Sequence, residues 1–188
     1  ERMNLSIKQK LMIITGGLIM MYGLTFVLVL YLIGYIKDEF QHFKESAYKG
    51  EVYTMSINKE LNYVSRLTRD IMLGNDFDKN MKKLNESSSK IKADFENLIK
   101  ITEPKDVAIT KDSYEKTMKF VNIGIQTVGK LKESGVSRES LDKVYAEYKI
   151  VATPPADEAR EAFHKVTKAQ EELAKRSEES IYTVMSNS

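Results

Sequence analysis

Apolar residues recur at steps of three and four along most of this chain, which is the spacing of one face of an α-helix. The longest such stripe runs through residues 38–73 and consists of Phe40, Phe43, Ala47, Gly50, Thr54, Ile57, Leu61, Val64, Thr68 and Ile71. It predicts a helix that packs one side against a core. Gly74 and Asn75 are expected to end this helix, and Asp76 is suited to cap the next one.

Three later segments carry stripes of the same kind. Their members are Phe77, Met81, Leu84, Ser88, Ile91, Phe95 and Leu98, then Tyr114, Met118, Val121, Ile125 and Val128, then Ala159, Phe163, Val166, Gln170, Leu173, Ile181 and Val184. Each stripe is narrow, which is typical of helices that bury one side in a bundle. No strand-like alternation of apolar and polar residues occurs.

The breaks between these helices follow from glycine and proline. The pair Glu103-Pro104 is expected to separate the second helix from the third, with Pro104 in the first turn of the third. Ser134-Gly135 is expected to end the third helix. Ser137 then begins a shorter helix that extends to about residue 150, with Glu139 or Ser140 at the capping-box position and with Leu141, Val144, Tyr145 and Tyr148 as its apolar residues.

The sequence Thr153-Pro154-Pro155 is expected to break the chain before the last helix, residues 155–188, because proline lacks the N–H that a helix interior needs. These segments predict an all-α fold. The expected architecture is an antiparallel, up-down four-helix bundle over residues 38–188, entered by a long N-terminal helix that continues into the first helix of the bundle.

Residues 11–36 contain no charged side chain. About 20 apolar residues suffice to cross the hydrocarbon core of a bilayer, so this segment predicts a transmembrane helix. A cleaved signal peptide is the alternative. The uncharged run is longer than the apolar region of a signal peptide, and no small-x-small cleavage site follows it. The sequence therefore favours an anchor that stays on the protein.

Charges on the two sides of this segment predict its orientation. Arg2, Lys8 and Lys10 precede it, and Asp38 and Glu39 follow soon after it. By the positive-inside rule, residues 1–10 lie in the cytoplasm and the bundle lies outside. In a bacterium this places the protein in the inner membrane with its bundle in the periplasm.

Composition excludes several classes of site. The chain has no cysteine, which rules out disulfides, thiolate metal sites and a thiol nucleophile. Its net charge is +2 and its basic residues form no clustered stripe, so no nucleic-acid partner is expected. His42 and His164 are far apart in sequence, and no catalytic or phosphate-binding motif occurs. We therefore predict no catalytic residue, no metal site and no cofactor.

The most informative polar residues lie near the end of the first bundle helix. Lys59, Asn62, Arg66 and Arg69 share a face opposite the core stripe. Neighbouring guanidinium groups repel each other unless an anion or acidic groups lie nearby, and arginine matches a carboxylate with two parallel hydrogen bonds. This face is therefore a candidate anion-binding site. In the alternative interpretation, Arg66 pairs with Asp70 and Arg69 lies in solvent.

Four segments resemble bacterial methyl-accepting chemotaxis receptors of the aspartate and serine type. MNLSIKQKL is similar to their start, and VSRLTRDIML to the distal end of their first periplasmic helix. VATPPADEAREAF is similar to the start of their fourth helix, and KRSEESIYTVMSNS to the segment before their second membrane helix. On this resemblance, the chain is expected to be a fragment that ends before a second membrane helix.

The resemblance implies a ligand-sensing receptor that forms a homodimer and signals by helix displacement, not an enzyme. Its ligand is a small anion such as an amino acid or organic acid, bound directly or through a periplasmic binding protein. Arg66 corresponds to a ligand-binding arginine and Arg69 lies near a second one, although their spacing is three where those receptors have four. A third arginine of those receptors falls near Leu61 and is missing here, and Ala152 and Thr153 fall near the residues that hold the ligand's amino end.

Two alternatives stay open at this point. The same sensor bundle could serve a histidine kinase or a cyclase, because the output domain alone separates these proteins. The second alternative is a membrane-anchored structural bundle that binds no small ligand.

Overall fold

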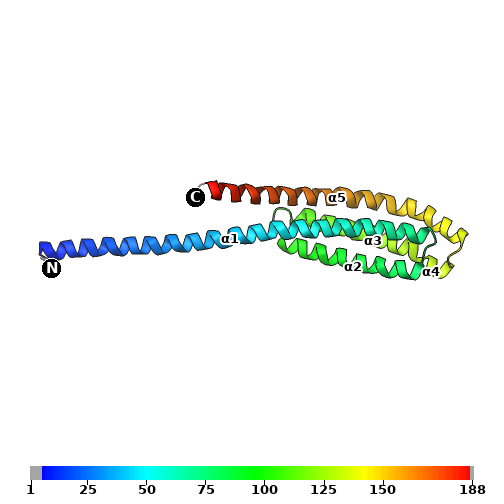
Figure 1. Cartoon of the computed structure of the whole chain (residues 1–188), viewed down its shortest axis with the longest axis horizontal. Helices are drawn as coiled ribbons and strands as arrows, with labels where there is room; N and C mark the ends of the chain where they lie inside the picture. Colours follow the sequence, from blue (N-terminus) through cyan, green and yellow to red (C-terminus); the bar gives the residue numbers. More distant parts are fainter. Residues whose placement is uncertain (1–5, 187–188) are drawn as a thin grey trace. The chain divides into compact units, whose positions relative to one another are not determined.

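The computed structural model describes residues 6–186, without the side chains of residues 39, 42, 181 and 184–186. The helices are α1 (Ile7–Met72), α2 (Phe77–Ile101), α3 (Val107–Gly129), α4 (Leu131–Ser134) and α5 (Arg138–Ser186), as Figure 1 shows. Residues 6–186 contain no strand, which confirms the all-α prediction. The predictions for the side chains of His42, Ile181 and Val184 lie outside the described residues.

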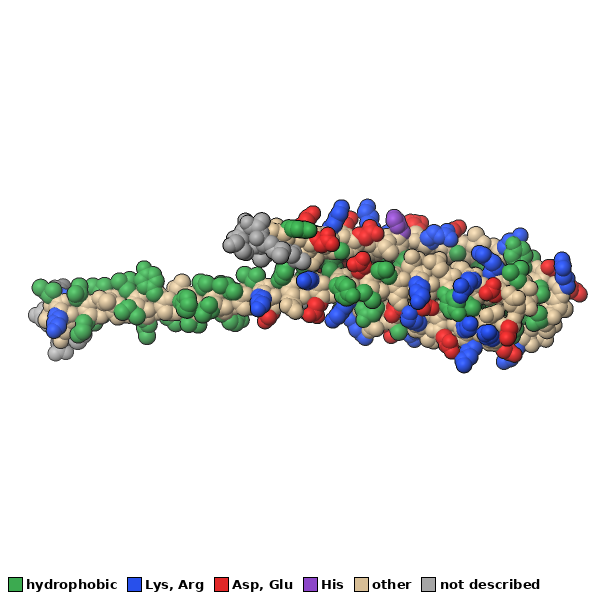
Figure 2. All heavy atoms as spheres, viewed as in Figure 1, with side chains coloured by type: hydrophobic (Ala, Val, Ile, Leu, Met, Phe, Trp, Pro, Cys, Tyr) green, Lys and Arg blue, Asp and Glu red, His purple; other side chains and the backbone are tan. Residues whose placement is uncertain are grey.

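The chain divides into two compact units, residues 1–43 and 44–188. The first unit contains the N-terminal part of α1, whose side chains are exposed from residue 11 through residue 36. Figure 2 shows hydrophobic side chains along it. By length and composition, α1 is apolar enough to cross a membrane. The helix α1 spans Ile7–Met72 without a break in its assignment.

The second unit packs the last part of α1 with α2, α3 and α5 around one hydrophobic core. Phe95 of α2 is fully buried at its centre, with its ring centroid 5.5 Å from that of Tyr114 and 6.0 Å from that of Phe163. The stripes predicted from the sequence supply most of the core, including Ile57, Val64, Ile71, Leu84, Ile91, Leu98, Val121, Val128, Ala159 and Val166. Tyr145, which was predicted to face the core, is half exposed.

The end of α1 and the start of α2 confirm the predicted stop and cap. Gly74 has a φ of +84°, a left-handed conformation that glycine adopts without strain. The Asn75 N–H donates to the Asp70 carbonyl at 3.1 Å and the Gly74 N–H to the Ile71 carbonyl at 2.9 Å, which is a Schellman motif. The Asp76 carboxylate then accepts the Lys79 N–H at 3.0 Å.

The start of α5 confirms a capping box of two serines. The Ser140 N–H donates to the Ser137 hydroxyl at 3.2 Å, and the Ser137 N–H donates to the Ser140 hydroxyl at 2.9 Å. Two backbone donors of the first turn are thereby satisfied. Of the two residues considered for the second box position, Ser140 occupies it.

The predicted break at Pro154-Pro155 is wrong, because α5 runs through both prolines as one helix, and Figure 1 shows it curving in its N-terminal part. The prolines remove the N–H groups that would bond the carbonyls of Ile150 and Val151, whose side chains are exposed to water. On the opposite side Ala152, Pro155 and Ala159 are buried. We attribute the continuity of α5 to this buried face, since packing outweighs local helix propensity.

Two other predicted boundaries also differ from the structure. Pro104 lies in the loop before α3 and not in its first turn, because a turn closed by the Asp106 N–H and the Glu103 carbonyl, 2.9 Å apart, precedes the helix. The third helix ends at Gly129, where the Lys130 N–H bonds back to the Thr127 carbonyl at 3.4 Å. The short helix α4 then reaches Ser134, and Gly135 follows with a φ of +72°.

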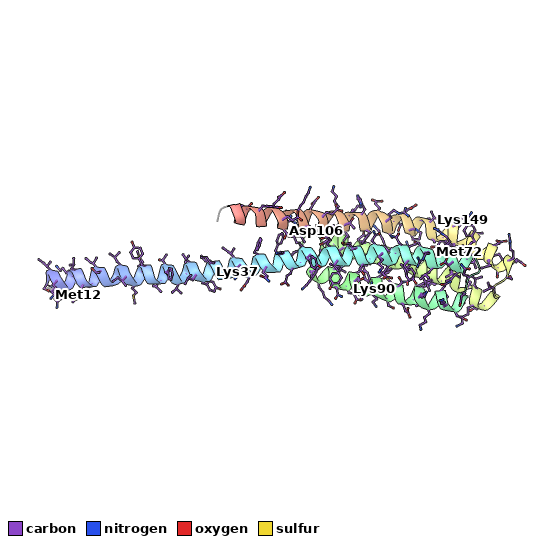
Figure 3. All side chains as sticks on the ribbon, viewed as in Figure 1. Met12, Lys37, Met72, Lys90, Asp106 and Lys149 are labelled. Atoms are coloured by element: carbon purple, nitrogen blue, oxygen red, sulfur yellow. The ribbon has the colours of Figure 1, made fainter. Side chains whose placement is uncertain are left out.

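A polar network joins α1 to α2 beside the core. Lys90, labelled in Figure 3, donates to Glu60 at 3.0 Å and to the Ser56 hydroxyl at 3.1 Å. Ser56 donates to Asp94 at 2.6 Å, and Ser87 donates to the second Glu60 oxygen. Burial raises the pKa of Glu60, but the Ser87 hydrogen bond and the Lys90 hydrogen bond and charge together hold this pKa below its ordinary value of 4.5. The ionised form is therefore the one that the fold stabilises.

We predict that Glu60 contributes to the loss of stability in acid. The free energy of unfolding should decrease as the pH is lowered, and part of this decrease should come from Glu60. A carboxylate whose pKa is lower in the folded protein stabilises the fold above its unfolded pKa of 4.5, and this contribution is lost as the pH falls through the lower folded value. Replacing Glu60 by glutamine should make the acid loss of stability shallower in denaturation curves collected at several pH values. Glu96→Gln, on the exposed side of α2, is the control. If the free energy of unfolding depends on pH in the same way for Glu60→Gln as for the native chain, Glu60 makes no such contribution.

Candidate functional site

Arg66 and Asn62 lie on the exposed side of α1. Together with Lys59, Glu60 and Tyr63 they line a hollow on this helix. The Arg66 guanidinium carbon lies 4.8 Å from the centroid of the Tyr63 ring, which is a cation–π contact. The contact keeps the guanidinium beside the helix, and no carboxylate among the described residues bonds to its N–H donors.

Within the described part of the chain, neither Arg66 nor Arg69 forms an ion pair. The alternative that Arg66 pairs with Asp70 is therefore not observed. Arg66 and Arg69 are both exposed, as predicted, and the core residues Val64 and Ile71 lie on the other side of the helix. Two uncompensated guanidinium groups thus lie one turn apart on the same helix.

Arg69 lies in a second hollow, of about 380 Å³, between α1 and α5. We call this hollow the α1–α5 groove; Met72 and Lys149, labelled in Figure 3, mark its two sides. Its lining residues are Ser65, Thr68, Arg69 and Met72 from α1, Phe120 from α3, and Tyr145, Tyr148, Lys149, Ala152, Thr153, Ala156, Asp157 and Arg160 from α5. The structure therefore brings Arg69, Ala152 and Thr153 together, and places Asn62 and Arg66 in the neighbouring hollow.

Ala152 and Thr153 have different surroundings in the groove. Ala152 is buried in the core and carries no polar side-chain atom, so it shapes the wall of the groove. Thr153 is exposed, and its hydroxyl donates to the Lys149 carbonyl at 2.7 Å. The same hydroxyl oxygen can still accept a hydrogen bond from a ligand.

The groove has aromatic walls and a mostly cationic rim. The Lys149 ammonium lies 5.0 Å from the centroid of the Tyr145 ring, and Arg160 pairs with Asp157 at 2.7 Å. Arg69 and Lys149 have no carboxylate partner among the described residues. An apolar pocket with a few converging charges is the usual form of a site for a small molecule. Arg69 and Lys149 therefore supply two cations to the lining of the groove.

The sequence predictions missed Tyr145, Lys149 and Arg160 as groove residues. The signal was present, because Tyr145, Lys149, Ala152, Ala156 and Arg160 step by three and four along one face of α5. The expected break at the two prolines divided this face between two helices and concealed it. A continuous helix places all five residues along the groove.

No group of three or more histidine, aspartate or glutamate residues that could hold a metal ion occurs in the part of the chain that the structure describes. Comparisons of the chain with protein-family models, curated proteins and solved structures find no match.

Proposed function

We propose that this chain is the sensor part of a transmembrane chemoreceptor of the methyl-accepting type, which binds a small organic anion and transmits the signal by displacement of helices. The α1–α5 groove carries the proposal, because it combines aromatic walls with Arg69 and Lys149, which have no carboxylate partner among the described residues. The helix that forms one side of the groove also contains the segment able to cross a membrane. No catalytic role is proposed for any residue.

The proposed bundle is antiparallel and up-down. Ser56 and Glu60 of α1 pair with Asp94 and Lys90 of α2, so residue numbers rise in one helix as they fall in the other. In the same way Lys119 and Lys130 contact Glu158 and Glu147 at the other side of the bundle. These pairs support an alternation of helix direction along the chain.

The proposed location is a bacterial inner membrane, with the bundle in the periplasm. The support is that Arg2, Lys8 and Lys10 precede the apolar segment, whereas Asp38 and Glu39 follow it closely. On this orientation, the groove samples the periplasm, where a small anion arrives directly or on a binding protein.

A homodimer is proposed because α1 carries an exposed seam that its own bundle leaves uncovered. We call this seam the outer stripe: Tyr48, Val52, Met55, Lys59, Asn62, Arg66 and Arg69. Its steps alternate between four and three, which is the spacing of a two-stranded coiled coil. Two chains anchored in one membrane leave it on the same side, so their first helices run parallel and the stripe of one copy meets the stripe of the other.

A thermal-shift screen of the whole chain in lipid nanodiscs tests this function. Amino acids and organic acids are added singly at one ionic strength, and unfolding is followed by circular dichroism. A ligand at about 100 times its dissociation constant stabilises the fold by about 2.7 kcal/mol. We expect at least one organic anion to raise the melting temperature. If no compound in the screen does so, the structural bundle without a ligand becomes the better account.

A further inference from the structure

Gly50 lies in the interior of α1, where glycine weakens a helix relative to alanine. It is the one glycine in residues 38–73, and it is buried. A contact with Gln170 of α5 explains its presence. A Cβ atom at Gly50 would lie 2.0 Å from the Gln170 Oε1 and 2.9 Å from the Gln170 Cδ. The absence of a side chain therefore lets the Gln170 amide pack directly against the backbone of α1, and we call this position of the amide seated.

The seated amide is buried without a hydrogen bond to its oxygen. Gln170 is 6% exposed, and its Oε1 has no hydrogen-bond partner among the described residues. A buried oxygen in this condition has lost its hydration without replacement, which costs free energy. The Gly50 carbonyl is itself an acceptor, and it receives the Thr54 hydroxyl at 3.0 Å. Packing, and not hydrogen bonding of the oxygen, therefore holds the amide in its seated position.

A hollow of about 210 Å³ between α1 and α5 offers the amide a second position. Gln170 itself lines this hollow, together with residues that include Thr54 and Asn58. Water reaches the hollow, because Asn58 is exposed. An amide turned into the hollow can bond to water or to the Asn58 side chain, which satisfies its oxygen. The Gln170 side chain thus has one position that packs closely and another that forms hydrogen bonds.

We propose that Gln170 is a two-position latch, which fixes the place of α5 along α1 while its amide is seated against Gly50. This inference rests on the helix displacement of the proposed function and names the contact that restrains it. The buried residues on either side of Gly50 in the same stripe, Ala47 and Thr54, both carry a Cβ atom. A shift of α5 along α1 moves the amide off the glycine and toward these side chains, unless the amide first turns into the hollow. The displacement of α5 then has two discrete states, as switching transitions between packed helices do.

A label distance between α1 and α5 in the full chain tests the latch in lipid nanodiscs. The native chain has no cysteine, so Lys44→Cys on α1 and His164→Cys on α5, both exposed, provide sites for nitroxide labels. Each site precedes its latch residue, Gly50 or Gln170, by six positions. In the antiparallel arrangement proposed above, the labels are offset by roughly 18 Å along the helix axes. Sliding of α5 along α1 therefore changes the distance between them, which pulsed electron paramagnetic resonance measures with unlabelled chain in excess.

Three variants and one control are compared in this labelled chain. Gly50→Ala adds the Cβ atom that the seated amide cannot accommodate, and Gln170→Ala removes the amide. Gln170→Met keeps a long side chain without an oxygen to satisfy, so it should remain seated. Gly129→Ala is the control, because nothing lies within 4 Å of a Cβ atom at Gly129. All are measured without added anion, so the result does not depend on a ligand for the groove.

We expect Gly50→Ala to change the mean label distance by roughly 1–2 Å, the size of helix shifts at interfaces, and Gln170→Ala to broaden the distance distribution. Gln170→Met and Gly129→Ala should match the native chain. If Gly50→Ala and Gln170→Ala both match the native chain, and circular dichroism shows them folded, the latch is overturned while the proposed function stands. An equal shift in Gly129→Ala would also overturn the latch. If Gly50→Ala does not fold, the distribution of Gln170→Ala decides.

Discussion

Replacing Phe95 by alanine should destabilise the bundle by about 3–5 kcal/mol, the cost of deleting a fully buried phenylalanine. Its ring lies between those of Tyr114 and Phe163, so the substitution removes two aromatic contacts and leaves a cavity at the point where α2, α3 and α5 meet. Chemical denaturation of the whole chain, followed by circular dichroism, measures the loss.

Tyr182→Ala is the control for this prediction. Tyr182 is also an aromatic residue within a helix, but 74% of its surface is exposed. Its replacement should change the free energy of unfolding by no more than about 0.5 kcal/mol, as is usual for surface positions. Equal effects of the two substitutions would show that Phe95 is not at the centre of the core.

Replacing Arg69 by alanine should weaken binding of the anion identified by the thermal screen by about tenfold or more. A hydrogen bond to a charged group contributes about 1.5–3 kcal/mol, and 1.4 kcal/mol corresponds to a factor of ten in affinity. Arg69 is exposed and forms no ion pair in the described structure, so its removal should leave the fold intact. Isothermal titration calorimetry measures the affinity, and circular dichroism checks the fold.

The matched control is Arg138→Ala, since Arg138 is 95% exposed in its side chain and lies at the start of α5, outside the residues that line the groove. It should bind the anion as the native chain does. Arg66→Ala should also weaken binding, because its guanidinium lies one turn from Arg69 with no carboxylate partner in the described structure. If Arg69→Ala and Arg66→Ala both bind as tightly as the native chain, the site lies elsewhere and these arginines are surface charge.

Local sequence signals predicted the parts of the fold that depend on a few neighbouring residues. Gly74 and Asn75 ended α1 through a Schellman motif, and Ser137 with Ser140 capped α5. Glycine and serine act there through their own backbone and hydroxyl groups, so no distant contact decides the outcome. Helical periodicity likewise identified the buried face of each long helix.

The helix break predicted at Pro154-Pro155 was wrong because contacts between residues distant in sequence outweigh the local signal. Two adjacent prolines are a strong local signal against a helix interior, yet the buried face through Ala152, Pro155 and Ala159 continues across them. Packing of that face depends on residues far away in sequence, and a single sequence does not display those contacts. The same error concealed the groove, because Lys149 and Arg160 were assigned to different helices.

The sequence predicted one site for all the candidate residues, but the structure divides them between two hollows. Arg66 and Arg69 were expected to act together, but one lies over the Tyr63 ring and the other borders the α1–α5 groove with Ala152 and Thr153. Spacing along a helix indicates which side a residue occupies, but the neighbouring helix at each edge of that side depends on the tertiary fold.

On the proposed function, an anion bound in the α1–α5 groove displaces α5 relative to α1. Nitroxide labels at Lys49→Cys on α1 and Lys175→Cys on α5, both exposed, allow the distance to be measured by pulsed electron paramagnetic resonance in nanodiscs, with unlabelled chain in excess. Interface helices shift by roughly 1–2 Å in such transitions. We predict that the anion from the screen changes the label distance by about this amount in the native chain and not in the Arg69→Ala chain. An unchanged distance at saturating anion would contradict signalling by helix displacement.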